Sequence, residues 1–368
     1  MALSKLVVGA SPQNPDMVWA TQFCSPDPFA LLVLNDNDRR VMVVNPLEYN
    51  RALKEAMAGE VVCSSQKLSE AILSLLESFN ISSVLVPEDF PASLYSYFLG
   101  KGVGVSISDS LKPLFPERAV KKDYEIEDIS YAQLAIEKAF KKLLDIIERA
   151  NVRDGKLWNG KKYLTSEDLR KIFELEVLKQ NCLSEATIVA SGDQAANPHC
   201  LGSGPILANT PIVIDMFTRS RKKWYWSDMT RTVVKGFFSN PARRLYEAVF
   251  EAQERALEMV RPGIDGWDIH NFVSSFFKEE GFKTEQVNGV WRGFFHGTGH
   301  GVGVEIHEWP RVSGRYKNQI LQPGNVITIE PGLYYPGIGG VRIEDTVVVT
   351  ENGYRNLAKP TKELIELP

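Results

Sequence analysis

Four acidic residues stand within, or at the end of, apolar strand-like runs in the C-terminal two thirds of the chain. They are Asp215 after PIVI, Asp228 in YWSDMTRTVV, Glu330 at the end of VITIE, and Glu344 in GVRIEDTVVV. A buried carboxylate is unfavourable unless it is paired or bound to a cation. A fold that buries these runs must therefore bring the four carboxylates to a shared cation site or give each one a partner of its own.

The histidines concentrate in the same part of the chain. His296, His300 and His307, three of the five histidines, lie within FFHGTGHGVGVEIHEWP. Glycines occupy every second position of this segment, and on a strand that spacing opens one face to close backbone approach while His300 projects from the other. The spacing lacks the third glycine of a dinucleotide-binding turn, which excludes a Rossmann site. His270, among polar neighbours on an expected helix, is interpreted as structural.

The chemistry of these residues favours metal-dependent hydrolysis. One imidazole and four carboxylates form an oxygen-dominated donor set that suits Mn²⁺ better than a thiolate-selected Zn²⁺. Four negative charges also balance two divalent cations, and sites with two cations carry out hydrolytic reactions. We therefore expect two divalent metal ions per chain, with Mn²⁺ favoured and Co²⁺ or Zn²⁺ as alternatives.

Composition excludes several other classes of protein. The 368 residues are 44% hydrophobic and 24% charged, with a net charge of −4, so neither disorder nor a large basic nucleic-acid surface is expected. Four scattered cysteines without a CxxC pair fit neither a disulfide framework nor a thiolate zinc site. The N-terminal run is too short and polar for a secretory signal, and no apolar stretch is long enough to span a membrane. We expect a reduced, cytoplasmic protein that binds neither nucleic acid nor membrane.

Length and residue pattern predict two domains. Residues 1–118 alternate short apolar strands with helices, which indicates a small α/β domain, and residues 111–123 have the prolines and basic cluster of a linker. Residues 123–368 separate long amphipathic helices from β-rich runs. That arrangement predicts an α+β domain with antiparallel strand pairing.

Hydrophobic periodicity and turn residues locate the elements of these domains. The expected helices cover residues 46–57, 68–79, 124–150, 166–179, 243–260 and 267–280. The expected strands cover residues 29–34, 41–44, 84–86, 103–107, 187–190, 211–215, 223–234, 326–330 and 340–350. The helix that follows Thr165 is expected to have an N-cap but no full capping box.

The motifs in the second domain resemble the pita-bread metallopeptidases, and within them the prolidase and Xaa-Pro aminopeptidase branch. The resemblance rests on Asp215, SDMTRT around Asp228, HGTGHGVG around His300, IHEWP around His307, TIEPG around Glu330 and VRIED around Glu344. It covers most of residues 123–368. Residues 1–118 are similar to the creatinase/prolidase N-terminal domain in their α/β pattern, size and position.

The resemblance implies a role for each ligand residue. It implies that Asp215 chelates one ion, that His300 and Glu330 chelate the other, and that Asp228 and Glu344 bridge both. Glu330 would also be the catalytic residue that accepts a proton from the attacking water and passes it toward the leaving nitrogen.

The resemblance also implies roles for four residues outside the ligand set. His199, in ANPHC, and His307 match catalytic histidines that bind substrate and stabilise the tetrahedral intermediate. His296 would line the substrate pocket. Arg342 would orient a carboxylate, either that of the substrate or that of Glu344.

The function that follows from the resemblance is hydrolysis of N-terminal Xaa–Pro bonds by a hydroxide that bridges two metal ions. The Xaa–Pro bond lacks an amide hydrogen, so its cleavage calls for dedicated machinery. An Xaa-Pro dipeptidase and an Xaa-Pro aminopeptidase both fit, and a homodimer is implied. The alternatives are a catalytically inactive pseudo-peptidase that binds peptides on the same fold and a metal-free, creatinase-like hydrolase.

The chain departs from the family pattern between its two aspartates. Asp215 and Asp228 are thirteen positions apart, two more than is common, and Met216-Phe217 replaces the usual glycine. The intervening FTRSRKKWYW is basic and aromatic. Because an insertion of two residues preserves the facing of a strand, we expect both aspartates to keep pointing at the ions. The longer tip is expected to change pocket access or subunit contacts.

Overall fold

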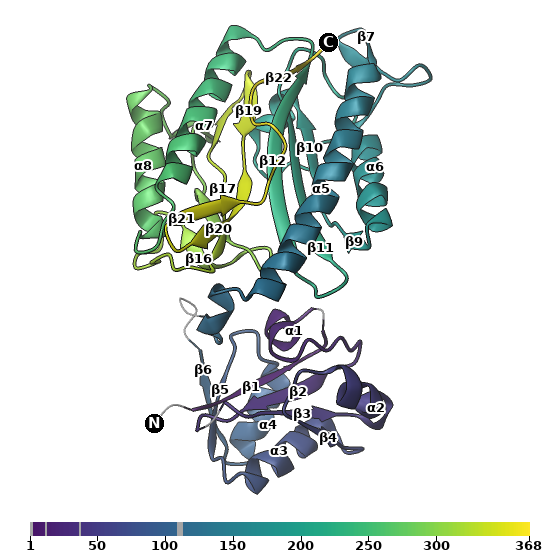
Figure 1. Ribbon diagram of the computed structural model, residues 1–368, viewed down its shortest axis with the longest axis vertical. Helices are drawn as coiled ribbons and strands as arrows, with labels where there is room; N and C mark the ends of the chain where they lie inside the picture. Colours follow the sequence, from purple (N-terminus) through teal and green to yellow (C-terminus); the bar gives the residue numbers. More distant parts are fainter. Residues whose placement is uncertain (1–2, 12, 37, 109–112) are drawn as a thin grey trace. The chain divides into compact units, whose positions relative to one another are not determined.

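The chain divides after Arg118 into two units, Met1–Arg118 and Ala119–Pro368. The computed structural model describes residues 3–11, 13–36, 38–108 and 113–368. Figure 1 colours the first unit purple to blue and the second from blue through green to yellow. The first two residues of the expected linker, 111 and 112, lie outside the described residues.

The first unit is built on a six-stranded sheet in the order β4-β3-β2-β1-β5-β6. Its strands are β1 (Ser4–Gly9), β2 (Phe29–Val33), β3 (Arg40–Val44), β4 (Glu60–Cys63), β5 (Ser83–Val86) and β6 (Gly104–Ile107). Its helices are α1 (Pro15–Thr21), α2 (Pro46–Glu55), α3 (Leu68–Ser78) and α4 (Ala92–Gly100). The three central strands β1, β2 and β3 pair antiparallel, and β4, β5 and β6 join them in parallel.

Both faces of this sheet are buried. Leu32 on β2 belongs to the core cluster on one face and Leu31 to the cluster on the other, as expected when consecutive side chains alternate between faces. The expected α/β domain is confirmed. Strand β1 and helix α1 were not predicted; Asn14 starts α1 by accepting a hydrogen bond from the backbone N–H of Met17 at 3.0 Å.

The second unit contains four long helices and a larger number of strands. The helices are α5 (Asp123–Arg149), α6 (Ser166–Lys179), α7 (Asn240–Glu258) and α8 (Gly266–Glu279), with a short 3₁₀ turn at Gly192–Ala196; another, at Pro116–Ala119, spans the boundary between the units. One sheet has the order β10-β11-β12-β22, with β9 also paired to β11, and another has the order β16-β15-β17-β20-β21. Three hairpins complete the unit: β7–β8, β13–β14 and β18–β19.

The strands of the first sheet are β9 (Cys182–Leu183), β10 (Ile188–Ser191), β11 (Ile212–Ser220), β12 (Trp226–Lys235) and β22 (Ile365–Leu367). Those of the second are β15 (Gly299–Gly301), β16 (Glu308–Val312), β17 (Val326–Ile329), β20 (Asp345–Thr350) and β21 (Gly353–Asn356). The hairpins are β7 (Asn151–Arg153) with β8 (Lys156–Trp158), β13 (Glu285–Val287) with β14 (Val290–Arg292), and β18 (Gly332–Tyr335) with β19 (Gly339–Arg342). The strand ladders of this unit are antiparallel apart from β12–β22, so the α+β prediction is confirmed.

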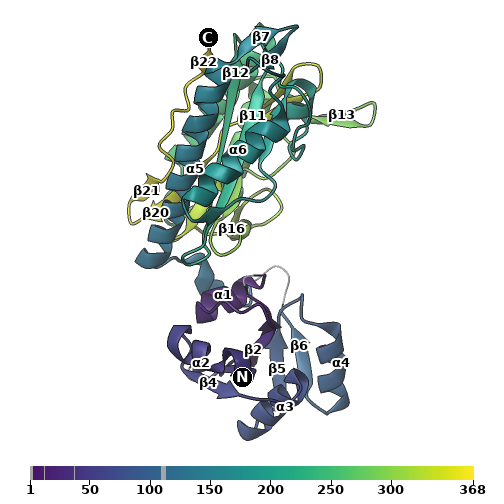
Figure 2. The ribbon, with the colours of Figure 1, turned by 90° about the vertical axis from the view of Figure 1, so that its right-hand side faces the viewer.

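Two helix pairs cover the sheets of the second unit. Helices α5 and α6 lie side by side against β11 and β12, and α7 and α8 pack beside the other sheet and the β18–β19 hairpin (Figures 1 and 2). On β11, Ile212, Ile214 and Met216 belong to the core beneath α5 and α6. The intervening residues, including Asp215, therefore face the opposite side. Among the described residues, no helix combines the length and apolarity that crossing a membrane requires.

The start of α6 corrects one prediction. Thr165 is the N-cap, its hydroxyl accepts from the backbone N–H of Asp168 at 3.2 Å, and the Asp168 carboxylate accepts from the backbone N–H of Thr165 at 3.3 Å. A full capping box is therefore present. The prediction was wrong because it required Glu or Gln at the third helical position, whereas the shorter aspartate also reaches back to the N-cap.

The alternating glycines allow the central strands to pack closely. A Cβ atom on Gly299 would lie 1.9 Å from the carbonyl oxygen of Thr328 on β17, and one on Gly301 would lie 2.3 Å from the carbonyl oxygen of Trp309 on β16. Both distances are well inside van der Waals contact, so neither position accepts a side chain. The glycines thus hold β15, and with it His300, between its two neighbours.

Candidate active site

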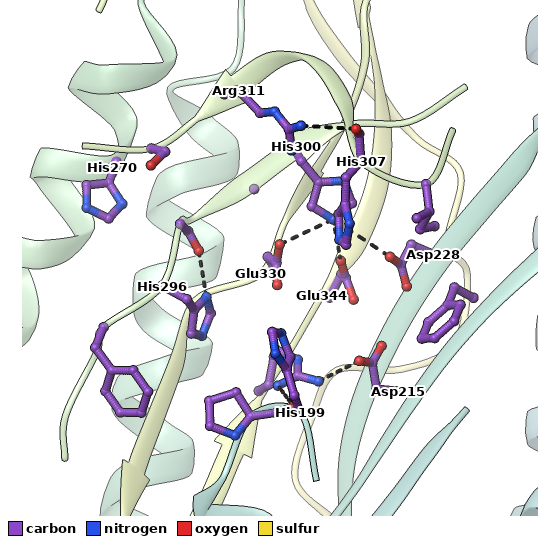
Figure 3. Close-up of a pocket in the computed structure, with 18 of the residues that line it drawn as sticks. His199, Asp215, Asp228, His270, His296, His300, His307, Arg311, Glu330 and Glu344 are labelled. Atoms are coloured by element: carbon purple, nitrogen blue, oxygen red, sulfur yellow. Dashed lines mark hydrogen bonds and ion pairs between the residues drawn. The ribbon is translucent and has the colours of Figure 1, made fainter. Parts of the chain in front are cut away.

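A pocket of about 1000 Å³ lies in the second unit, and every residue that the sequence assigned to the site lines it. These residues are His199, Asp215, Asp228, His296, His300, His307, Glu330, Arg342 and Glu344. They come from segments that are far apart in the sequence. Figure 3 labels ten of the residues that line the pocket, and eight of these nine are among them.

Backbone pairing accounts for the placement of the acidic residues. Asp215 on β11 lies opposite Thr230 on β12, and Asp228 lies two residues before Thr230 on the same face. Glu330 directly follows β17, where its backbone N–H donates to the Thr298 carbonyl at 2.7 Å. Glu344 lies between β19 and β20, and its backbone N–H donates to the Thr230 carbonyl at 3.1 Å. Adjacent strands thus deliver the four carboxylates to one place.

His300 lies at the centre of the carboxylates (Figure 3). Its Nε2 is 3.4 Å from Glu330 Oε1, 3.8 Å from Asp228 Oδ2 and 4.0 Å from Glu344 Oε1. Its Nδ1 lies 3.2 Å from the carbonyl oxygen of Gly301. A carbonyl only accepts hydrogen bonds, so Nδ1 carries the hydrogen and Nε2 presents its lone pair to the carboxylates.

Burial and mutual repulsion shift the acid–base equilibria of this group. Burial and the Glu344 carboxylate raise the pKa of Asp228 and the pKa of Glu330 well above their ordinary values. Burial and Asp215 raise the pKa of Glu344 to about 8. Burial and the neighbouring His307 lower the pKa of His300 well below its ordinary value. The carboxylates therefore resist ionisation in the absence of a cation, while the imidazole stays neutral.

Asp215 has a different set of contacts from the other acids. Its Oδ2 accepts from Arg342 Nη2 at 2.6 Å, and its Oδ1 lies 2.9 Å from the Thr230 hydroxyl. The same hydroxyl lies 2.7 Å from Glu344 Oε2 and accepts from Arg342 Nε at 3.2 Å. Thr230 thus links Asp215 to Glu344, although Asp215 does not approach the His300 ring.

Arg342 pairs with Asp215, a partner that the sequence did not suggest. Its Nη2 donates to Asp215 Oδ2 at 2.6 Å, while its Nε donates to the Thr230 hydroxyl at 3.2 Å. Its Nη1 donates to the Tyr334 hydroxyl at 2.8 Å, and that hydroxyl lies 2.9 Å from Nε2 of His296. Burial alone would lower the pKa of Arg342, but Tyr334 and the neighbouring carboxylates outweigh burial and raise it above its ordinary value.

His296 is neutral in this arrangement. Burial, followed by Arg342, lowers the pKa of His296 to about 3. Its Nδ1 lies 2.7 Å from the Gly297 carbonyl oxygen and donates to it, so its Nε2 accepts from Tyr334. A continuous chain of hydrogen bonds therefore runs from Asp215 through Arg342 and Tyr334 to His296.

The other three histidines also face the pocket. The His307 ring packs edge-on against His300 with 4.4 Å between ring centroids, and burial and Arg311 lower the pKa of His307. His199 follows the 3₁₀ turn at Gly192–Ala196 and lines the pocket. His270, interpreted from sequence as structural, has its Nδ1 3.0 Å from the Thr298 hydroxyl and also lines the pocket.

Sequence reasoning missed two basic residues at one edge of the pocket. Arg311 and Arg315 line it together with Ser313, Gly314 and Tyr316, and Arg311 Nη2 donates to the carbonyl oxygen of His307 at 3.0 Å. We call Arg311 and Arg315 the cationic wall. The WPRVSGRY segment, which begins two residues after His307, carries both arginines, and its position near a site residue was the available signal.

The donor set fits a divalent cation site. One ligand atom from each of Asp228, His300 and Glu344 can be chosen so that all three lie within 4.8 Å of one another. Asp228 Oδ1 is buried and has no hydrogen-bond partner among the described residues. An unpartnered carboxylate oxygen beside a neutral imidazole is the arrangement that a bound cation completes.

Known proteins resemble this chain along most of its length. Residues 127–351 match the model of metallopeptidase family M24. The chain is 37% identical to an Xaa-Pro dipeptidase of Pyrococcus furiosus over 90% of this chain and 88% of the relative.

Solved structures give the same result for the fold. The structure is similar to a prolidase of Pyrococcus horikoshii with a TM-score of 0.82 and 29% identity, covering 98% of this chain and 95% of that one. It is also similar to an X-Pro aminopeptidase of Thermotoga maritima with a TM-score of 0.79 and 25% identity, covering 98% and 97% of the two chains.

Proposed function

This chain belongs to metallopeptidase family M24, and we propose that it is an Xaa-Pro dipeptidase that acts with two divalent metal ions. One observation carries the proposal: a neutral, buried His300 is surrounded by carboxylates with raised pKa values at the base of a pocket that also has a cationic wall. The sequence resemblance to this family is confirmed, and with it the assignment as a peptidase. The names of the relatives support the Xaa–Pro substrate class.

We propose the five ligands that the resemblance implied. Asp228 and Glu344 would be shared by both ions, Asp215 would hold one of them, and His300 with Glu330 the other. The oxygen-rich donor set favours Mn²⁺. Bound there, the two ions would supply an activated water and polarise the carbonyl of the scissile bond.

Glu330 is the carboxylate best placed to move a proton. Its side chain is 18% exposed, compared with 6% for Asp228 and 2% for Glu344. When ionised, its carboxylate can accept a proton from water and give it to the departing proline nitrogen. That nitrogen needs the proton because it leaves as an amine.

His199 and His307 provide donors on the open side of the pocket. We propose that they bind the substrate carbonyl region and stabilise the charge that develops on its oxygen. His296 and Arg342 act indirectly, because their side-chain nitrogens already make hydrogen bonds to Gly297, Tyr334 and Asp215.

The cationic wall favours a dipeptide over a longer peptide. A dipeptide ending in proline carries its free carboxylate one residue beyond the scissile carbonyl, and an arginine fork binds a carboxylate well. Arg311 is held beside the catalytic histidines by its hydrogen bond to the His307 carbonyl. We propose that Arg311, supported by Arg315, binds the proline carboxylate.

Kinetics with matched peptides test this assignment. With Mn²⁺ present, Leu-Pro should be hydrolysed, whereas Leu-Pro amide and Leu-Pro-Gly should be poor substrates. Arg311→Ala should raise KM for Leu-Pro by about tenfold or more, since it removes a charge-assisted contact. Arg355→Ala, an exposed arginine on β21, is the control. Equal turnover of dipeptide and amide would contradict the dipeptidase assignment, and no turnover of any of them would contradict Xaa–Pro hydrolysis itself.

The structure does not favour either of the alternative functions that the sequence left open. A peptide-binding pseudo-peptidase or a metal-free hydrolase would be expected to lack part of the carboxylate set, yet all four acids and His300 line one pocket. A metal analysis discriminates directly, because neither alternative should hold two divalent ions per chain tightly.

Three further properties are proposed at the level of the whole chain. We propose a catalytic domain at residues 123–368 preceded by a separate domain at residues 1–118, a homodimer, and a cytoplasmic location. The division of the chain after Arg118 supports the first, and the four scattered cysteines without a CxxC pair support a reducing compartment. Limited proteolysis, sedimentation analysis and cell fractionation test the three proposals respectively.

A further inference from the structure

The basic and aromatic segment between the two aspartates has no part in the function proposed above. It comprises the end of β11, a turn, and the start of β12, and its sequence from Phe217 to Trp226 is FTRSRKKWYW. The two strands pair in register, with Asp215 opposite Thr230, Phe217 opposite Asp228 and Arg219 opposite Trp226. Directly opposed residues of an antiparallel pair share a face.

Phe217 therefore lies on the carboxylate face of the hairpin. It is two residues from Asp215, directly across from Asp228, and among the residues that line the pocket. The opposite face of the same strand carries Met216, which is buried in the core beneath α5 and α6. The Phe217 ring is consequently an apolar group adjacent to the two strand aspartates.

The surrounding side chains hold this ring in place. The rings of Phe217 and Trp226 are 6.4 Å apart between centroids, and the guanidinium of Arg219 lies 5.2 Å from Trp226 and 5.0 Å from Trp224. The Ser184 hydroxyl donates to the Phe217 carbonyl at 2.7 Å. Stacked aromatic and guanidinium groups of this kind restrict movement. Arg219 and the two tryptophans thus brace Phe217.

Three other apolar residues line the pocket together with Phe217. Ile188 on β10 lies opposite Asp215 in the ladder and so shares its face, and Ala186 and Leu201 also line the pocket. Leu201 is 44% exposed, which is unusual for a leucine beside a catalytic cluster. We call Ala186, Ile188, Leu201 and Phe217 the apolar wall.

The apolar and cationic walls come from different segments of the chain. Ile188 and Phe217 of the apolar wall are on β10 and β11, whereas Arg311 of the cationic wall is on β16. In Figure 3, Asp215 and Asp228 lie on one side of the pocket, His270 and His296 lie on the other, and Arg311 lies above. Gly314, within the segment of the cationic wall, is adjacent to the His270 ring, since a Cβ there would lie 2.8 Å from it. A dipeptide whose carboxylate bound the cationic wall and whose carbonyl lay over the cluster would have its first side chain available to contact the apolar wall.

We propose that Phe217 is a specificity-determining residue that selects substrates whose first residue has a large apolar side chain. This inference rests on the proposed Xaa–Pro hydrolysis and names its substrate class: dipeptides such as Leu-Pro, Met-Pro and Phe-Pro. Fitting several extra methylene groups against a preformed apolar surface improves kcat/KM by about tenfold or more over a small side chain. A cationic first residue of the same length gains nothing from that surface.

A substrate series with the Mn²⁺-loaded full chain tests the proposal without any variant. The value of kcat/KM should rise from Gly-Pro through Ala-Pro to Leu-Pro and Met-Pro. Lys-Pro, which matches Met-Pro in length but carries a charge, should fall well below it. A flat profile, or equal rates for Met-Pro and Lys-Pro, would overturn the proposal while leaving Xaa–Pro hydrolysis intact.

Variants then assign the preference to Phe217. Phe217→Ala should lower the Leu-Pro to Ala-Pro ratio of kcat/KM by about fivefold or more, and Phe217→Leu, which keeps an apolar side chain, should retain most of it. The ratio within one preparation is independent of the fraction of folded, loaded enzyme. Phe237→Ala is the control, because Phe237 is 65% exposed at the far end of β12.

The possible outcomes distinguish the role of Phe217 from the proposed Xaa–Pro hydrolysis. An unchanged ratio in Phe217→Ala, with all dipeptides still hydrolysed, contradicts the role of Phe217 alone. Loss of the ratio in Phe237→Ala as well contradicts a local effect. Failure of the unmodified enzyme to hydrolyse any Xaa-Pro dipeptide contradicts the proposed function, and this inference with it.

Discussion

Thr230 shows how strongly the residues of the pocket depend on one another. Its hydroxyl lies within hydrogen-bonding distance of both Asp215 and Glu344, and it accepts from Arg342. A hydroxyl has one hydrogen, so it donates to only one of the two carboxylates at a time. Thr230 therefore couples the orientations of two proposed ligands without contacting an ion itself.

Replacing Thr230 by valine keeps its shape and removes the hydroxyl. We expect Thr230→Val to weaken divalent metal binding by about 10–100-fold, the usual effect of losing a group that orients a ligand. Thr218→Val is the matched control: Thr218 is equally buried on the other face of β11, and its hydroxyl has no hydrogen-bond partner among the described residues. Competitive titration with a metal indicator measures both. Equal affinities would contradict a role for Thr230 in the site.

The raised pKa of Glu344 predicts a pH-dependent effect of metal on stability. Its ordinary pKa of 4.5 is raised to about 8 in the folded chain. A raised folded-state pKa stabilises the fold fully below pH 4.5, and this contribution is lost as the pH rises toward 8, at up to about 1.4 kcal/mol per pH unit. Bound cations favour the ionised carboxylate and offset the loss.

The difference in melting temperature between metal-loaded and metal-free protein should therefore widen from pH 5 to pH 8. Parallel thermal melts in buffers across this range measure it, with a chelator in one series and Mn²⁺ in the other. A difference that stays constant or narrows would show that the carboxylates are ionised in the metal-free protein, contrary to their raised pKa values.

At the scale of single elements, the regular periodic segments were predictable from sequence and the short, context-dependent ones were not. Helix α5 was predicted nearly to its ends because its apolar residues recur at helical spacing. The β13–β14 hairpin was missed because each strand has only three residues. Strand β11 extends five residues beyond the predicted end at Asp215, through a basic segment whose strand conformation comes from pairing with β12.

Two alanine substitutions test how closely strand β15 packs against its neighbours. Gly299→Ala would place a methyl group 1.9 Å from the Thr328 carbonyl oxygen, whereas Gly297→Ala places one no closer than 3.4 Å to its nearest neighbour. We expect Gly299→Ala to lower the free energy of unfolding by about 3 kcal/mol or more and Gly297→Ala by about 1 kcal/mol or less. Chemical denaturation of the two variants checks this. Similar losses would contradict the close approach of β15 and β17.

At the scale of the whole molecule, the sequence predicted which residues form the site but only some of the contacts between them. The resemblance named nine site residues, and all nine line one pocket. It did not predict that Arg342 pairs with Asp215 or that Tyr334 connects Arg342 to His296, because these contacts depend on how β11 and the β18–β19 hairpin approach each other.

The account as a whole depends on the cluster binding the cations that make Xaa–Pro hydrolysis possible. The most direct test measures divalent metal content by mass spectrometry and Leu-Pro turnover on the same preparations of unmodified protein, Glu344→Ala and the exposed control Glu351→Ala. The account predicts close to two ions and full turnover for the unmodified protein and the control, with both lost together in Glu344→Ala. Near-normal turnover by Glu344→Ala, or by any preparation free of divalent metal, would contradict it.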